Sequence, residues 1–200
     1  MDLMVIDGLL TVVTEPHAAG PAAWTQAALL AASLASEQEV PLWPSLAGTL
    51  EAAGWVVEAS SQQTLALPLL TGSLRADPGL AVLLDRRGGI HLADEATALL
   101  ETWWQRSLTA SGPTNVVLLA GTLALDAKRH ATAQLYAVTL PSPSWRWLVR
   151  TQLVQTRLNR LSLRLDEARH AALAPTLAER TRALAGQVRT VHLGAALRGA

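Results

Sequence analysis

The sequence predicts an α+β protein: a mostly antiparallel sheet with about four helices packed on one face. Asp7-Gly8 separates two short apolar runs, alanine- and leucine-rich segments repeat at helical spacing, and strand patterns dominate the second half. Half of the 200 residues are hydrophobic and 16% are charged, which is typical of a chain that buries a core. We expect one domain over residues 1–200. The alternative is a division into an acidic half, 1–112, and a basic, strand-rich half, 113–200, with a C-terminal helix.

The first predicted element is a β-hairpin. Leu3–Ile6 and Leu9–Val13 are apolar and contain β-branched residues. Asp-Gly between two such runs is the signal of a two-residue hairpin turn. One longer strand with a bulge is the competing interpretation.

Four segments carry helix signals. They cover residues 21–36, 45–53, 94–108 and 166–185. Pro21 suits the first turn of a helix, and Ser45 and Asp94 can each cap the helix that follows them. Gly54 is expected to end the second helix, since glycine often follows a helix C-terminus. Pro175 interrupts the last helix.

The remaining apolar runs predict strands. They lie at residues 55–59, 64–69, 80–92, 115–126, 129–140 and 188–193. The polar residues 60–63 are expected to turn between the first two, and Gly88-Gly89 to turn inside the third, which reads as a hairpin. Residues 126–128 would turn between the next pair. Gly121 inside a strand pattern marks a bulge or a close approach of another group to the backbone.

The segment 142–170 is rich in arginine. It contains Arg146, Arg150, Arg157, Arg160 and Arg164. On a helical wheel the arginines share one arc, but the apolar residues form no face of their own, which disfavours a helix. Alternation on either side of residues 154–159 instead predicts two strands joined there by a turn or bulge. The arginines would then lie on the outer face of the sheet, either simply solvated or as an anion-binding surface.

The charge is unevenly distributed along the chain. Residues 1–100 hold eleven acidic side chains and three arginines, a net of −8, whereas residues 101–200 carry a net of +8. Complementary packing of the two halves explains this distribution, and a basic face for a nucleic acid or another polyanion is the alternative. Only one of the sixteen basic side chains is a lysine.

Several kinds of chemistry are disfavoured. The chain contains no cysteine, which excludes disulfides, thiolate nucleophiles and cysteine-ligated metals. No nucleotide-binding, zinc-protease or serine-hydrolase motif occurs. Glu167 and His170 have the spacing of half a carboxylate-bridged metal site, but a solvated acid and a surface histidine explain them better. Asp126 and His130 are interpreted as neighbours in sequence alone. We therefore predict no metal, no cofactor and a non-catalytic protein.

The sequence gives no sign of a membrane segment. No apolar run reaches about 18 residues, so no membrane span is expected. The N-terminus lacks the basic start of a signal peptide. We expect the chain as it stands to be cytoplasmic, or periplasmic if it is the mature form of an exported protein.

Four patches, in order along the chain, resemble the CsiV-type family of peptidoglycan-associated envelope proteins. They are an opening strand (LLTVVTEP), a helix that leads into a Gly-aromatic strand (LAGTLEAAGWVVEASSQQ), a Gly-Thr-Leu strand with a basic turn (LLAGTLALDAKRHATAQLYAV) and an arginine-rich strand (QTRLNRLSLRLDEARH). The resemblance implies a periplasmic, non-enzymatic protein that binds cell-wall material and supports its synthesis.

We predict a ligand-binding surface on the arginine-rich sheet face. The candidate residues are Trp145, Arg146, Trp147, Arg150, Arg160 and Arg164, and the resemblance adds Arg129 beside them. The cell-wall ligand that the resemblance implies suits this surface, since indole rings stack on sugars and arginine pairs with the carboxylates of peptides. The expected partner is a cell-wall polymer or a protein. The alternatives are a cytoplasmic nucleic-acid or protein-interaction module that uses the same face, and a small enzyme without a recognisable motif. No oligomeric state is predicted.

Overall fold

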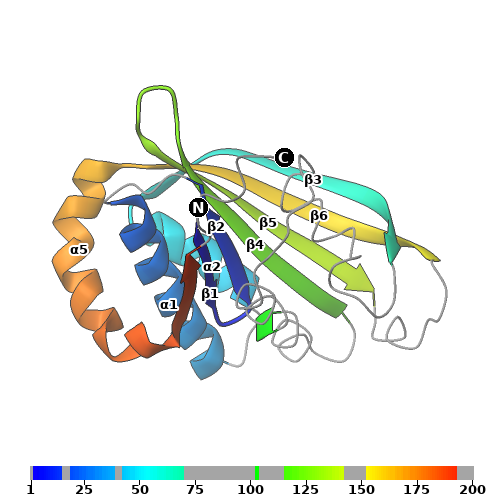
Figure 1. Cartoon of the computed structure of the whole chain (residues 1–200), viewed down its shortest axis with the longest axis horizontal. Helices are drawn as coiled ribbons and strands as arrows, with labels where there is room; N and C mark the ends of the chain where they lie inside the picture. The colour runs from blue at the N-terminus through cyan, green and yellow to red at the C-terminus, as the bar shows by residue number, and fades with distance from the viewer. Residues whose placement is uncertain are drawn as a thin grey trace.

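The computed structural model describes residues 2–14, 19–38, 42–69, 102–103, 115–141 and 152–192. In this part of the chain, helices gather at one end of a long, seven-stranded sheet (Figure 1). The helices are α1 (Gly20–Gln38), α2 (Leu42–Ala52), α5 (Glu167–Thr181) and the 3-10 helix η3 (Arg182–Gln187). The strands are β1 (Asp2–Ile6), β2 (Leu9–Val13), β3 (Trp55–Leu69), β4 (Asn115–Leu125), β5 (Ala131–Pro141), β6 (Gln152–Leu165) and β7 (Val188–His192).

The predicted α+β class is confirmed, but the sheet is mixed. The strand order is β3-β6-β5-β4-β2-β1-β7, and β2 pairs with β4 in parallel. The prediction of a mostly antiparallel sheet was therefore wrong, as was the number of about four helices, since three α-helices lie in the described ranges. The parallel pair arises because α1, α2 and β3 intervene between β2 and β4, and parallel neighbours need such a crossover. Strand patterns alone do not report which distant strands become neighbours.

The N-terminal hairpin forms as predicted. Ile6 pairs with Leu9, which leaves Asp7 and Gly8 as the two turn residues. Asp7 has a φ of 50°, in the left-handed region that such tight turns require. The turn chemistry therefore fixes the register of β1 against β2, and no bulge is needed.

Two predicted breaks do not occur. Residues 55–69 form the single strand β3, with only a register shift between Val57 and Ala59, and residues 154–159 lie inside the single strand β6. The polar run 60–63 was read as a turn because it lacks apolar alternation. Side chains 58–64 are all exposed, so this part of an edge strand needs no apolar residues.

The described segments that were predicted to be helical are helical, but the helices begin and end at other residues than predicted. α2 begins at Leu42, before the predicted cap Ser45, and the expected turn residue Gly54 follows it with a φ of 101°. α5 is capped by Asp166, whose side chain accepts a hydrogen bond from the Arg169 backbone N–H, and it continues through Pro175. Of the predicted helix 94–108, residues 102 and 103 are described and helical. The rest of it and the predicted hairpin at 80–92 lie outside the described residues.

The face of the sheet on which the helices pack is called here the helix face. Trp24 of α1 is fully buried there and donates a hydrogen bond from its indole nitrogen to the Thr11 hydroxyl, at 2.8 Å. Its ring meets Trp55 edge to face, with centroids 5.7 Å apart. A Cβ on Gly121 would overlap the Trp24 ring. Gly121 is thus a close-approach point and not a bulge, since the β4–β5 register runs through it unbroken.

Side chains on the other side of β1 and β2, the outer face of the sheet, are also buried. These are Leu3, Val5, Leu10 and Val12, none more than 8% exposed. All five residues of β2 are buried, which is the pattern of a strand covered on both faces. Farther along the sheet, the described outer-face side chains of β5 and β6 are half-buried or exposed. None of the described helices is long and apolar enough to cross a membrane.

Replacement of Gly121 by alanine should destabilise the fold by about 1–3 kcal/mol, because the Trp24 ring is held by Thr11 and Trp55 and cannot yield to the new methyl group. Gly48, in α2, has nothing within 4 Å of its would-be Cβ. Gly48→Ala is the matched control and should stabilise the protein by about 1 kcal/mol through helix propensity. Chemical denaturation of both variants measures these changes, and equal midpoints would contradict the close packing at Gly121.

Candidate functional site

The structure places part of the predicted surface. Arg160 and Arg164 lie on the outer face of β6, opposite in parity to the buried Leu163 and Leu165. Arg129 lies in the turn between β4 and β5. Thr132, three residues later, pairs in register with Arg164, so the turn lies near Arg164. The other candidates, Trp145, Arg146, Trp147 and Arg150, lie outside the described residues.

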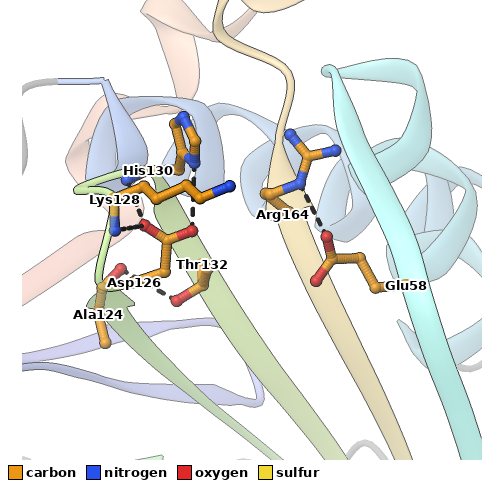
Figure 2. A network of polar contacts seen from close by, with 7 residues as sticks. All are labelled: Glu58, Ala124, Asp126, Lys128, His130, Thr132 and Arg164. Carbon is orange, nitrogen blue, oxygen red and sulfur yellow. Dashed lines mark hydrogen bonds and ion pairs between the residues drawn. The ribbon is translucent and has the colours of Figure 1, made fainter.

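Arg164 is held by an acid from the neighbouring strand. Its Nε donates to Oε1 of Glu58 at 2.7 Å, and both side chains are partly exposed. The register shift between Val57 and Ala59 inserts Glu58 as an extra residue beside Arg164. Figure 2 shows the two terminal guanidinium nitrogens of Arg164 pointing away from Glu58. The ion pair thus orients the arginine through Nε alone.

Arg160 is held in the same manner by strand β5. Its Nε donates to Oε1 of Gln134 at 2.8 Å, and its guanidinium carbon lies 5.8 Å from the centre of the Tyr136 ring. The Ser162 hydroxyl donates to the same Gln134 oxygen at 2.9 Å. The side chains of these four residues therefore form one ordered polar cluster across β5 and β6.

The two arginines share a chemical arrangement, which we call the arginine row. Each uses Nε on a fixed acceptor from a neighbouring strand, and neither side chain has another hydrogen-bond partner among the described residues. The terminal nitrogens of a guanidinium form a planar fork that matches a carboxylate or a phosphate. Four residues along a strand place the two arginines about 13 Å apart. The row can therefore bind two oxyanions of one extended ligand.

The turn after β4 is built around Asp126. Its Oδ1 accepts hydrogen bonds from the backbone N–H groups of Lys128 and His130, both at 2.8 Å (Figure 2). Arg129 has a φ of 65°, and its backbone N–H donates a hydrogen bond to the Asp126 carbonyl oxygen. The carboxylate therefore replaces missing backbone partners and holds two exposed basic side chains, Lys128 and Arg129, at the tip of the hairpin.

Asp126 and His130, interpreted as neighbours in sequence alone, are in contact. His130 Nδ1 lies 3.1 Å from Asp126 Oδ2, the relation between the acid and the base of a hydrolase triad. Within the described part of the chain, no hydroxyl donates to His130, and the Thr132 hydroxyl donates to the Ala124 carbonyl instead (Figure 2). The pair therefore serves the turn.

The sequence interpretation of His170 was wrong, because this side chain is buried and not on the surface. Its Nδ1 lies 3.0 Å from the carbonyl oxygen of Ala53, and its backbone packs against Gly54. His170 thus joins the start of α5 to the turn that precedes β3, while Glu167 is exposed. In the described ranges, no group of three or more His, Asp or Glu side chains could hold a metal ion.

Sequence reasoning missed the residues that orient the arginines. Gln134 and Tyr136 share the parity of Thr132 along β5, so the alternation placed them on one face. Their neighbours became known only with the β5–β6 register, which pairs Tyr136 with Arg160 and Gln134 with Ser162. Glu58 depended on the register shift in β3, for which the sequence carries no signal.

Comparisons with known proteins give little further information. No protein-family model matches the sequence, and no curated protein matches it. One solved structure, described as "Structure of the Evf virulence factor", is similar with a TM-score of 0.43 and 9% identity, over 92% of this chain and 82% of that one. We draw no conclusion about function from a likeness at this level.

The pKa of Asp126 should lie below its ordinary value of 3.8, chiefly because the His130 backbone N–H stabilises the carboxylate. The turn should therefore be most stable above that value and lose stability as the pH falls through the lowered pKa. An NMR titration of the Asp126 carboxyl measures the pKa. In His130→Ala it should stay below 3.8, since the backbone donors remain. Equal values in the folded protein and in urea would contradict this.

Proposed function

We propose that the protein is a non-catalytic binding protein whose arginine row takes an extended, carboxylate-bearing glycopolymer such as peptidoglycan. The observation that supports this is the paired arrangement of Arg160 and Arg164, each oriented through Nε, with terminal nitrogens that bond to none of the described residues. Such preorganisation lowers the entropy lost when a ligand carboxylate is bound. The neighbouring Tyr136, Gln134 and Ser162 offer the aromatic and hydrogen-bonding groups that sugars require.

The charges of the arginine row favour a polymer with widely spaced carboxylates over a nucleic acid. Glu58 neutralises part of the positive field beside Arg164 and would repel a phosphate backbone. Nucleic-acid affinity grows with the number of phosphates neutralised, and a row of two arginines with an acid among them supplies few such contacts. A cytoplasmic nucleic-acid module remains the alternative that the experiment separates.

The first experiment is co-sedimentation of the full chain with insoluble peptidoglycan, beside retention on DNA-cellulose, each at low and high salt. Retention on peptidoglycan that survives high salt supports the proposal. Retention on DNA alone that is lost with salt supports the nucleic-acid alternative, because phosphate contacts weaken steeply with ionic strength. Retention on neither contradicts both.

Arg160→Gln and Arg164→Gln should each weaken retention on peptidoglycan about tenfold, since each removes a charge-assisted contact. Glu58→Gln should strengthen it, because the amide keeps an oxygen acceptor for Arg164 Nε, as Gln134 does for Arg160, and the negative charge is removed from the row. Arg180→Gln is the matched control: Arg180 is exposed on α5, away from the row, and its loss should leave binding unchanged. Arg160→Gln and Arg164→Gln variants that are retained as well as the unmodified protein would contradict the proposal.

A further inference from the structure

Strand β3 forms one margin of the sheet (Figure 1), and within the described residues its second side has no strand beside it. It is 15 residues long, and it pairs with β6 and with no other strand of the described ranges. The side chains of residues 58–64 are all exposed, and among the described residues no strand other than β6 pairs with this part of β3. An edge of this kind presents backbone N–H and C=O groups that can pair with a further strand.

The two margins of the sheet differ in how they are protected. The opposite edge strand, β7, is only 5 residues long and carries Arg189 and His192. β3 contains one charged residue, Glu58, and that charge is paired with Arg164. Edge strands that must stay single are usually short, charged or interrupted. In β3 the interruptions, the shift at 57–59 and Pro68, lie toward the ends and leave the centre regular.

The sequence of β3 is nearly symmetrical about Gln62. An apolar start, WVV-A, and an apolar end, LALPL, flank the neutral polar centre SSQQT. In an antiparallel pair centred on Gln62, Ala59 lies opposite Leu65, Ser60 opposite Thr64, and Gln62 opposite its own copy. Glu58 would face Ala66, so no like charges meet. Opposed Ser, Thr and Gln side chains can hydrogen-bond across such a pair.

We propose that the open edge of β3 is a dimerisation surface that takes β3 of a second copy of this chain, antiparallel about Gln62. The pairing is self-complementary, as a two-fold interface must be, and it joins two sheets into one continuous sheet. Pairing of β3 with β7 of another copy would instead add one copy after another in an open chain of molecules. The short, basic β7 is a poor partner for such pairing. The inference does not depend on the proposed function.

The register supplies a charge-exchange test. Gln62→Lys places two lysines directly opposite each other, as Gln62→Glu does with two glutamates, so each variant alone should be monomeric. An equal mixture of the two should dimerise again. Light scattering after gel filtration, over a series of concentrations, should give twice the chain mass of 21.2 kDa for the unmodified protein and for the mixture. Thr176→Lys, exposed on α5, is the control and should remain dimeric.

Because the chain contains no cysteine, cross-linking gives a second, independent measurement. Opposed residues in an antiparallel pair have Cα atoms about 4.5–5.5 Å apart, within reach of a disulfide. Gln62→Cys should therefore oxidise to a covalent dimer. Ser60→Cys should not, since its copies would lie about 13 Å apart along the strands. Ser60→Cys mixed with Thr64→Cys should cross-link.

Three outcomes would overturn the proposal. They are an unmodified protein that is monomeric at every concentration, a Gln62→Lys variant that still dimerises, and a Ser60→Cys variant that cross-links as readily as Gln62→Cys. Folding of each variant is checked by circular dichroism. Failure of peptidoglycan binding would leave these results unchanged, so the two proposals are tested separately.

Discussion

The packing of Trp24 against the centre of the sheet is the contact on which the rest of the structure depends. Its indole nitrogen bonds to Thr11 on β2, its ring occupies the space left by Gly121 on β4, and its edge meets Trp55 at the start of β3. One side chain from α1 thus joins three strands that are distant in sequence. Phenylalanine is absent from the chain, so indole rings supply most of the large aromatic packing. A buried indole N–H is stabilised by an acceptor, and Trp103 donates to the Gly8 and Leu119 carbonyls, whereas the buried Trp55 nitrogen has no hydrogen-bond partner among the described residues.

The core determines which side chains lie on the outer face, because successive side chains along a strand point to opposite faces of the sheet. Leu163 and Leu165 must face the helices, so Arg160, Ser162 and Arg164 must face away from them. The arginine row is therefore a consequence of core packing as much as of its own chemistry. Alternation does not explain why Gln134 and Glu58 are present as acceptors. These two residues fix the two guanidinium planes. Exposed ion pairs add little stability, so these partners are better explained by the orientation of the arginines than by the stability of the fold.

Local chemistry made part of this structure predictable. The Asp7-Gly8 hairpin, the helix stop at Gly54 and the alternation of 160–165 each depend on residues adjacent in sequence, and each was confirmed. The β2–β4 parallel pair, the position of Glu58 and the burial of His170 depend on contacts between distant segments. The polar centre of β3 was misread for a related reason. A strand at a sheet margin has no core to face there, and its polar sequence then resembles a turn.

The dimer about Gln62 would change what the arginine row can do. A two-fold axis through that pair runs perpendicular to the sheet, so the outer faces of both copies point the same way. Two β6 strands would be separated by two β3 strands, about 14 Å, close to the spacing of Arg160 and Arg164 within one row. Four oriented arginines would then lie on one surface at similar intervals. Under the proposed function, a single row with an acid beside it would bind a carboxylated polymer weakly. Two rows on one rigid sheet would bind it with a gain in avidity that needs no new contact, since the second row acts at high effective concentration.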